Sequence, residues 1–367
     1  MPEISIVLPV YNGERFMEEA LYSIKNQTFT DWELIVVDDG SADRTPDIVE
    51  RYEKEDGRIR LFRNEKNRGL PESLNIGFKR AKGNYLTWTS DDNRYRKDAL
   101  ETMYQVLCKT PGLYMVSADM SLIDENGSDL GVTAEYDEAA VAFENNVGAC
   151  FLYKREVMET VGGYDNQFSC VEDYDYWLRI LSHYGHIERI GRVLYDYRCH
   201  GGSLTGTRQK FIKKQLLKLR EKYTDFILAH ADFNEKALCR IYYESIEAGC
   251  EDQDFLAKLK DRAPLLKNET NTVLPGEKII IFGAGELGEK AFQSFGSQVG
   301  YFVDNDRKKT GTLKCGLKIL SIQDVKNLKE EFVIMIAVSV PYIYGIIEQL
   351  NEEGIARFLT YQSYRRG

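Results

Sequence analysis

The fold is decided by residues 4–41, whose sequence is ISIVLPVYNGERFMEEALYSIKNQTFTDWELIVVDDGS. Residues 4–10 form a mainly apolar run, typical of a strand covered on both faces, and residues 32–37 form a second one. Between the two runs, apolar side chains recur at helical spacing, at Phe16, Ala20, Leu21 and Ile24. The stretch therefore predicts a strand, a helix that begins near Glu14, and a second strand parallel to the first.

The same alternation continues downstream. The further elements that it predicts are a helix through Ile48 and Tyr52, a strand at 59–64, a helix at 71–83 and a strand at 85–89. Strands that alternate with helices indicate an α/β fold with a doubly wound parallel sheet. Ligands bind such sheets at the carboxyl ends of the strands. Three of these ends are polar, at 9–12, 38–41 and 90–93, and we expect them to form one pocket.

Two adjacent carboxylates, Asp91 and Asp92, follow the strand at 85–89 after a single residue, Ser90. Neighbouring carboxylates repel each other and resist desolvation, so the pair needs a compensating cation or a site that benefits from one. The alternative is a polar strand end that turns into solvent. Because the other strand ends are also polar, a pocket is the favoured interpretation.

Residues 110–205 are less regular, with strand-like segments at 113–120 and 148–154 and a helix at 172–185. This helix has one apolar face, formed by Tyr174, Trp177, Leu178 and Leu181. Glu172 and Asp173 lie in its first turn, where the helix dipole favours ionised carboxylates. Capping alone would explain one of the two.

The C-terminal part predicts separate units. Residues 206–270 are polar and helix-forming, and residues 267–277 resemble a linker. A strand, a turn with glycines at 283, 285 and 288, and a helix follow, with Asp304 about 20 residues further on, as in a dinucleotide-binding fold. We therefore expect a domain at 1–205, a helical connector at 206–272 and a small Rossmann-like α/β domain at 273–367.

The composition limits the class of protein. The formal net charge of −10 argues against a nucleic-acid partner bound through a general positive field. The seven cysteines are scattered and never spaced C-x-x-C, which fits reduced thiols in the cytoplasm. No secretion signal or membrane-spanning run is visible. We expect a cytoplasmic protein.

Three ordered motifs carry a family resemblance: residues 4–45, residues 67–93 ("NRGLPESLNIGFKRAKGNYLTWTSDDN") and the segment from "GACFLYK" to "VEDYDYWLRI". Together they resemble the family 2 glycosyltransferases of the GT-A fold. The resemblance covers roughly residues 3–205. It implies transfer of a sugar from a UDP-sugar donor, with inversion at the anomeric carbon, to a hydroxyl of a glycan or lipid-linked saccharide.

The same resemblance assigns the donor site. Asp92 would bind Mn²⁺ or Mg²⁺, and Asp91 would contact the ribose or support the metal shell. Asp39 would recognise the uracil. Three further residues would line the nucleotide pocket, Pro9, Tyr11 and Glu14. Arg68 would lie near the diphosphate and the base, or would be a solvent-facing loop residue. The "YRCH" segment would bring His200 to the metal or diphosphate, with Ser203 helping to close the site.

The resemblance places the catalytic base at Asp173. An acceptor hydroxyl must lose its proton as it attacks the anomeric carbon, and a nearby carboxylate can accept that proton. Glu172 is adjacent, but successive helical residues point about 100° apart, so both are not expected to serve one hydroxyl equally. Asp175 is a further candidate.

Other interpretations stay open at this stage. A nucleotidyltransferase would share the nucleotide sheet and metal carboxylates, but residues 8–16 lack its Gly-rich basic loop. A non-enzymatic sensor could bind a nucleotide-sugar, or a dinucleotide through its C-terminal unit. Residues 207–223 predict an amphipathic helix with a basic face, which would allow peripheral membrane contact, or would simply pack its apolar face on the catalytic domain.

Overall fold

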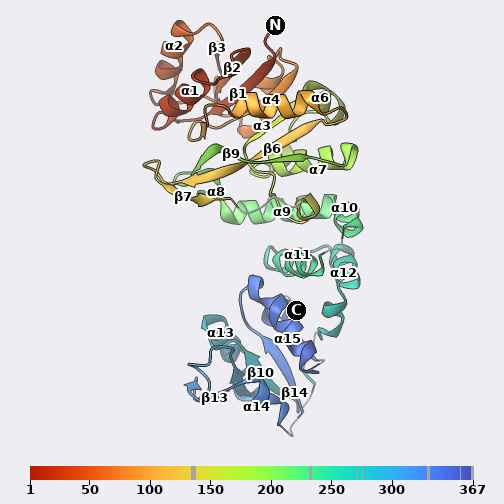
Figure 1. Cartoon of the computed structure of the whole chain (residues 1–367). Coiled ribbons are helices and arrows are strands. Elements are labelled where there is room, and N and C mark those ends of the chain that lie inside the picture. Colours follow the sequence, from red (N-terminus) through yellow and green to blue (C-terminus); the bar gives the residue numbers. More distant parts are fainter. Residues whose placement is uncertain are drawn as a thin grey trace. The chain divides into compact units, whose positions relative to one another are not determined.

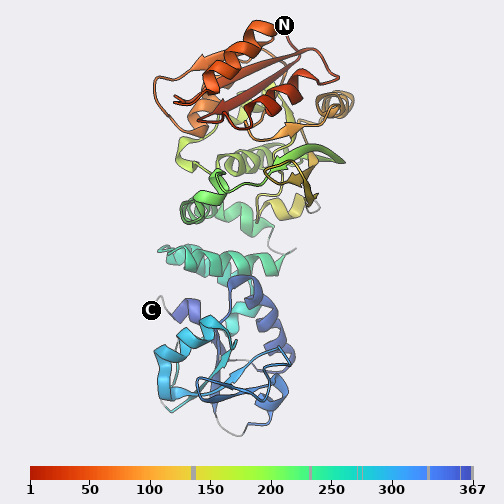
Figure 2. The same cartoon turned by 90° about the vertical axis from the view of Figure 1, so that its left-hand side faces the viewer.

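The computed structural model describes residues 1–133, 138–230, 234–270, 272–274, 276–328, 331–355 and 357–364. The chain forms two compact units, Met1–Tyr223 and Thr224–Gly367, which Figures 1 and 2 show from two directions. Each unit is described by itself. Among the described residues, no helix combines the length and the apolarity that crossing a bilayer requires.

The first unit is built on one mixed sheet. Its strands are β1 (Ile4–Val10), β2 (Trp32–Asp38), β3 (Ile59–Arg63), β4 (Tyr85–Trp88), β5 (Arg94–Tyr95), β6 (Met115–Ile123), β7 (Asp129–Val132), β8 (Phe151–Lys154) and β9 (Glu188–Arg198). They lie in the order β3-β2-β1-β4-β8-β6-β9-β5, and β7 pairs with β6.

Half of this sheet is the predicted parallel sheet. β1 pairs in parallel with β2 and β4, and β2 pairs in parallel with β3. Beyond β4 the sheet becomes mixed, because β8 runs antiparallel to both β4 and β6. The two-residue strand β5 pairs with β9, which places Arg94 opposite Asp196. This pairing brings the chain just after β4 next to the end of β9.

The helices of the first unit are α1 (Met17–Lys25), α2 (Thr45–Glu55), α3 (Leu70–Phe78), α4 (Ala99–Lys109), α5 (Glu138–Val141), α6 (Arg155–Val161), α7 (Glu172–Tyr184), α8 (Leu204–Thr207) and α9 (Gln209–Lys222), with a 3₁₀ turn at Asn166–Phe168. α1 buries Met17, Ala20, Leu21 and Ile24 against one face of the sheet. On the other face Gly77 of α3 approaches Val7 so closely that a Cβ atom would lie 2.3 Å from its side chain. Helices therefore cover both faces, as the doubly wound pattern predicts.

The second unit has a sheet of its own, which is parallel except for the short edge strand that runs antiparallel to its neighbour. Its strands are β10 (Lys278–Phe282), β11 (Val299–Val303), β12 (Leu313–Lys314), β13 (Leu317–Leu320), β14 (Phe332–Ile336) and β15 (Phe358–Thr360), in the order β12-β13-β11-β10-β14-β15. Its helices are α10 (Thr224–Ala229), α11 (Glu235–Glu247), α12 (Gln253–Arg262), α13 (Glu286–Phe295), α14 (Ile322–Lys326), α15 (Val340–Glu352) and α16 (Tyr361–Tyr364), with 3₁₀ turns at Pro264–Asn268 and Gly296–Gln298.

The glycine-rich turn between β10 and α13 is held by the acidic residue that the sequence pairs with it. The Asp304 carboxylate accepts a hydrogen bond from the Ala284 backbone N–H at 2.9 Å and pairs with Lys309 Nζ at 2.9 Å. A Cβ atom at Gly288 would lie 1.8 Å from the Gly283 carbonyl oxygen, so the turn requires glycine there. These contacts explain the turn by packing within the unit.

The boundary between the two compact units falls between Tyr223 and Thr224. Helix α9 belongs to the first unit, whereas α11 and α12 belong to the second. The division into 1–205, 206–272 and 273–367 stays a prediction, and the predicted linker at 267–277 includes residues 271 and 275, which lie outside the described residues.

Candidate active site

The three polar strand ends meet at one edge of the first sheet. The Asp39 backbone N–H bonds to the Val10 carbonyl at 2.8 Å, and the Thr89 N–H bonds to the Val7 carbonyl at 3.0 Å. The loops after β1 and β2 are joined by the Asn12 N–H, which donates to Ser41 Oγ at 2.8 Å. Parallel pairing thus brings 9–13, 38–45 and 89–93 together, as expected for a ligand-binding rim.

Asp91 lies against the loop that follows β1. A Cβ atom at Gly13 would lie 2.1 Å from Asp91 Oδ2, so only glycine allows this approach. Burial raises the pKa of Asp91 to about 7, and the neighbouring charge of Asp92 adds to the effect. The two adjacent carboxylates therefore do not share one environment, and Asp91 gives up its charge more readily than an exposed aspartate.

Asp92 is paired with His200. Its Oδ2 lies 3.0 Å from His200 Nε2, and its Oδ1 accepts a hydrogen bond from Ser90 Oγ at 2.5 Å. Both side chains are mostly but not wholly buried. An oxygen and an imidazole nitrogen therefore face each other at the edge of the rim.

This pair offers two ligand atoms of kinds that divalent cations accept. Among the described side chains, no group of three or more His, Cys, Asp or Glu is arranged to hold a metal. A cation bound together with phosphates needs only one or two protein ligands, because phosphate oxygens and water supply the rest. Asp92 and His200 supply that number.

The Asp39 carboxylate organises the loop between β3 and α3. Its oxygens accept hydrogen bonds from Asn64 Nδ2 at 2.8 Å and from the backbone N–H groups of Arg68 and Gly69 at 2.9 and 2.8 Å. The Arg68 side chain is exposed, and only its backbone takes part in this contact. Asp39 thus fixes the position of the Arg68 backbone, from which the exposed side chain extends.

The other predicted nucleotide contacts lie around the same rim. Pro9 is buried within β1, opposite Val37. Tyr11 is exposed at the end of that strand. Glu14 Oε2 accepts hydrogen bonds from the backbone N–H and Nε of Arg44, which ties the loop after β1 to the start of α2.

Asp173 stands in the first turn of α7 with both oxygens occupied. Oδ2 accepts a hydrogen bond from Asn145 Nδ2 at 2.9 Å, and Oδ1 accepts one from the Tyr174 backbone N–H at 2.7 Å. Burial raises the pKa of Asp173, while these two donors oppose the rise by stabilising the ionised form. The result is an oriented carboxylate that is more basic than an exposed aspartate.

The charges of Asp92 and Asp173 both affect the pKa of Tyr197. Burial raises the pKa of Tyr197, and the negative charges of Asp92 and Asp173 both add to that rise. Asp92 and Asp173 thus both lie within electrostatic reach of Tyr197. Their roles at the site stay predictions.

The two neighbours of Asp173 have different environments. Glu172 is buried, and burial raises its pKa to about 8, with the charge of Asp173 as the second cause. Asp175 is fully buried and accepts contacts from three groups: Arg179 Nε at 2.9 Å, Lys222 Nζ at 2.7 Å and Tyr223 OH at 2.8 Å. Asp175 therefore joins α9 to α7, and its oxygens are already occupied.

Two residues at the site had not been singled out from the sequence. Asn145 precedes β8 in an irregular segment without periodicity, and nothing local marks it as a partner of Asp173. Arg198 ends β9, two residues before His200, and its backbone N–H donates to Asn93 Oδ1 at 2.8 Å. Arg198 lies in the "YRCH" segment, but the family resemblance gives a role in that segment to His200 alone.

Comparisons with known proteins agree on a family for the first unit. The model of glycosyl transferase family 2 matches residues 5–162, and a model described as C2185-like, N-terminal, matches residues 276–358. TuaG of Bacillus subtilis, whose name proposes a teichuronic acid biosynthesis glycosyltransferase, is 27% identical over 223 residues, which cover 60% of this chain and 88% of that protein. An uncharacterized glycosyltransferase of Rickettsia typhi is 30% identical over 223 residues, which cover 56% of this chain and 67% of that protein.

A solved structure shares the fold. S. aureus TarS 1–349, in complex with UDP-GlcNAc, matches with a TM-score of 0.52 and 15% sequence identity, and the match covers 72% of this chain and 83% of that chain. At this identity the likeness shows the fold alone.

Proposed function

The chain belongs to the family 2 glycosyltransferases, and on this basis we propose that it moves a sugar from a UDP-sugar to a hydroxyl of a glycan or lipid-linked saccharide, with inversion at the anomeric carbon. The observation that carries the proposal is the Asp92–His200 pair, with 3.0 Å between Oδ2 and Nε2, at the rim where the strand ends meet. This pair would face the leaving diphosphate, and the oriented Asp173 carboxylate would face the attacking hydroxyl.

The donor nucleotide would lie on the rim formed by the loops after β1 and β2. A carboxylate offers about four acceptor positions. Asn64, Arg68 and Gly69 occupy three of those on Asp39, which leaves one for the N–H of a uracil ring. The exposed ring of Tyr11 and the exposed guanidinium of Arg68 are available to the base and the diphosphate. The wall of this proposed nucleotide pocket would also include Pro9, Glu14 and Asp91.

Asp92 and His200 would hold Mn²⁺ or Mg²⁺. When bound, the cation offsets the negative charge that grows on the diphosphate as the bond to the sugar breaks. Asp92 supplies the hard oxygen ligand that both cations prefer. Ser90 fixes the carboxylate by binding its other oxygen.

Asp173 would act as the general base. Asn145 and the Tyr174 N–H orient its carboxylate, and it takes the proton of the acceptor hydroxyl as that oxygen attacks the anomeric carbon. The attack comes from the side opposite the diphosphate. A single displacement of this kind inverts the configuration without a covalent intermediate.

The acceptor side includes a proposed membrane contact at the start of α9. The C-terminal half of α9 buries Leu217 and Leu219 within the first unit. The first six residues of α9, 209–214, include no buried side chain, and Phe211 is 43% exposed beside the exposed Lys210 and Lys214. An exposed aromatic ring among cations suits an anionic membrane surface that presents a lipid-linked acceptor.

The experiment that tests the proposed function is release of UDP by the purified protein from a panel of UDP-sugars and GDP-sugars, with Mn²⁺, with Mg²⁺ and with a chelator. We expect release from one UDP-sugar, stimulated by the cation and by acceptor glycans. Release that prefers GDP-sugars, or that is unchanged by the chelator, would contradict the donor or the metal assignment respectively.

A further inference from the structure

Arg198 places a buried guanidinium beside the turn that carries Asp92. Its side chain is 1% exposed. Each nitrogen of the guanidinium has an acceptor: Nε donates to the Asp92 carbonyl at 2.9 Å, Nη1 to the Glu125 carbonyl at 3.0 Å, and Nη2 to Glu19 Oε2 at 2.7 Å. A buried cation is costly unless its donors are satisfied, so this geometry is tightly specified.

Arg198 holds the 90–93 turn at two points. Besides the contact with the Asp92 carbonyl, its backbone N–H donates to Asn93 Oδ1 at 2.8 Å. Asn93 Nδ2 in turn donates to Ser90 Oγ at 2.5 Å, and Ser90 Oγ donates to Asp92 Oδ1 at 2.5 Å. The chain of contacts that begins at Arg198 therefore ends on the carboxylate proposed to bind the cation.

The same residue also supports His200. The Arg198 Cζ atom lies 4.4 Å from the centroid of the Phe16 ring, and that ring meets the His200 ring edge-on with 5.3 Å between centroids. Phe16 thus fills the space between the guanidinium and the imidazole. Both members of the Asp92–His200 pair are connected to Arg198, one through hydrogen bonds and one through packing.

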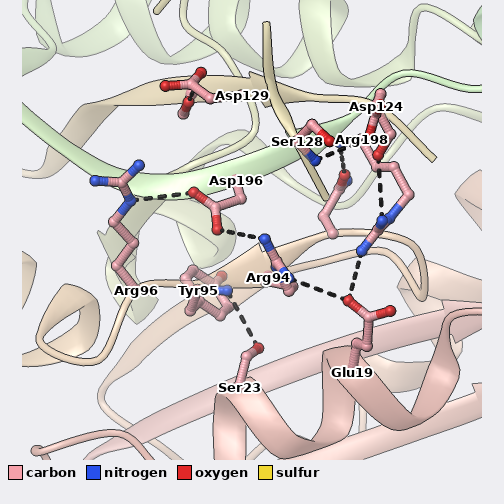
Figure 3. A network of polar contacts seen from close by, with 12 residues as sticks. Glu19, Ser23, Arg94, Tyr95, Arg96, Asp124, Ser128, Asp129, Asp196 and Arg198 are labelled. Atoms are coloured by element: carbon pink, nitrogen blue, oxygen red, sulfur yellow. Dashed lines mark hydrogen bonds and ion pairs between the residues drawn. The ribbon is translucent and has the colours of Figure 1, made fainter. Parts of the chain in front are cut away.

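Glu19 on α1 supplies the carboxylate that balances Arg198. Figure 3 shows Arg94 and Arg198 reaching the same carboxylate of Glu19, and Arg94 also reaching Asp196. The Arg94 Nη1 distance to Glu19 Oε2 is 3.2 Å, longer than the 2.7 Å from Arg198 Nη2. The Arg94 guanidinium forms ion pairs with Glu19 and Asp196, which makes Arg94 a matched control.

We propose that Arg198 is a positioning residue for the divalent cation: it sets Asp92 Oδ2 and His200 Nε2 in the arrangement that binds the cation together with UDP, and Glu19 holds Arg198 in place. The inference rests on the proposed function, because it concerns the same cation. It adds a residue that does not itself touch substrate or metal. Residues that orient metal ligands change metal affinity by about 10- to 100-fold when mutated.

The test is a titration of free Mn²⁺ by electron paramagnetic resonance, in the presence of UDP and without any sugar transfer. Arg198→Gln should weaken Mn²⁺ binding by about 10- to 100-fold, and Arg198→Lys should lie between this variant and the wild type, since an ammonium cannot reach three acceptors in a fork. Arg94→Gln should bind Mn²⁺ like the wild type. Thermal unfolding of each variant checks the fold.

A second pair of variants covers the case in which Arg198→Gln does not fold. Glu19→Gln keeps Arg198 but removes its charge partner, and should weaken Mn²⁺ binding several-fold, whereas Glu18→Gln, which only loses a surface pair with Arg51, should not. Equal Mn²⁺ affinity in folded Arg198→Gln and wild type, or equal losses in Arg94→Gln and Arg198→Gln, would overturn the inference while leaving the proposed function intact. Failure of the wild type itself to bind Mn²⁺ with UDP would overturn both.

Discussion

His200 Nε2 lies 3.0 Å from Asp92 Oδ2, although 108 positions separate the two residues in the chain. The contact exists because β5 and β9 pair, with Arg94 opposite Asp196. The turn before β5 and the loop after β9 therefore meet at the same edge of the sheet. The proposed cation site therefore depends on this long-range pairing.

Asp92→Ala should abolish the Mn²⁺-dependent part of UDP binding, because the cation loses its oxygen ligand and the diphosphate charge is left uncompensated. Calorimetry with UDP, with and without Mn²⁺, measures this. Asp39→Ala should also weaken UDP binding, yet Mn²⁺ should still strengthen what remains. If UDP affinity in Asp92→Ala still rises with Mn²⁺ as in the wild type, Asp92 is not a ligand.

The free energy of unfolding should fall as the pH rises from about 5 to about 8. Burial raises the pKa of Glu172 from its ordinary value of 4.5 to about 8. In this window the native state keeps a proton that the unfolded chain has lost, so raising the pH favours unfolding. Above the pKa of Glu172 in the native state, its contribution to the free energy of unfolding no longer changes with pH.

Glu172→Gln should reduce this pH dependence, because an amide cannot titrate, and Asp91, whose pKa burial raises to about 7, should account for part of the slope that remains. Urea unfolding at several pH values checks it, with Glu18→Gln at the surface as the control. A wild-type slope in Glu172→Gln would mean that Glu172 does not hold the proton.

Tyr223→Phe should lower the free energy of unfolding by about 1–3 kcal/mol, the range for a buried polar group that loses a partner. The Tyr223 hydroxyl donates to Asp175 at 2.8 Å, and Asp175 lies on the helix that carries Asp173. Tyr184→Phe, whose hydroxyl makes only a 3.5 Å contact at the surface, is the matched control. Equal unfolding midpoints for the two variants would show that the Asp175 contacts do not stabilise the fold.

Changing Lys210, Lys214 and Lys218 to Gln should reduce binding to anionic vesicles by about 100-fold at low salt, since each basic residue contributes about 1 kcal/mol near such a surface. Co-sedimentation with vesicles that contain anionic or only neutral lipids measures it. The same change at Lys66, Lys79 and Lys109, which are also exposed, should have less effect. Equal binding by both triple variants, or no salt-sensitive binding by the wild type, would rule out this surface.

Local pattern was sufficient to predict the parallel half of the first sheet. The apolar runs that became β1 and β2 each carry a full strand of buried side chains, and β4 buries its two central residues. Parallel pairing then puts Asp39 and Asp91 on one rim whatever the rest of the chain does. The predicted helix start near Glu14 was early, because residues 11–15 form a loop that bonds to residues 41–45 before α1 begins at Met17.

The contacts that arrange the chemistry were not predictable in this way. β5 has only two residues, too few to show any periodicity, yet its pairing with β9 sets the position of Arg198. Asn145 meets Asp173 across 28 positions from an irregular segment. Such hydrogen bonds depend on tertiary packing, so only three-dimensional structure identifies the partners of Asp92 and Asp173.

The central claim is that Asp173 is the base of a sugar transfer that uses a UDP-sugar. The most direct measurement compares wild type and Asp173→Asn in two assays, Mn²⁺-dependent UDP affinity and the rate of sugar transfer from the donor identified in the panel. The amide keeps the size of the side chain but cannot take a proton. The account predicts unchanged UDP affinity and a transfer rate lower by about 10²- to 10⁴-fold; a near wild-type rate in Asp173→Asn, with loss of transfer in Glu172→Gln instead, would contradict it.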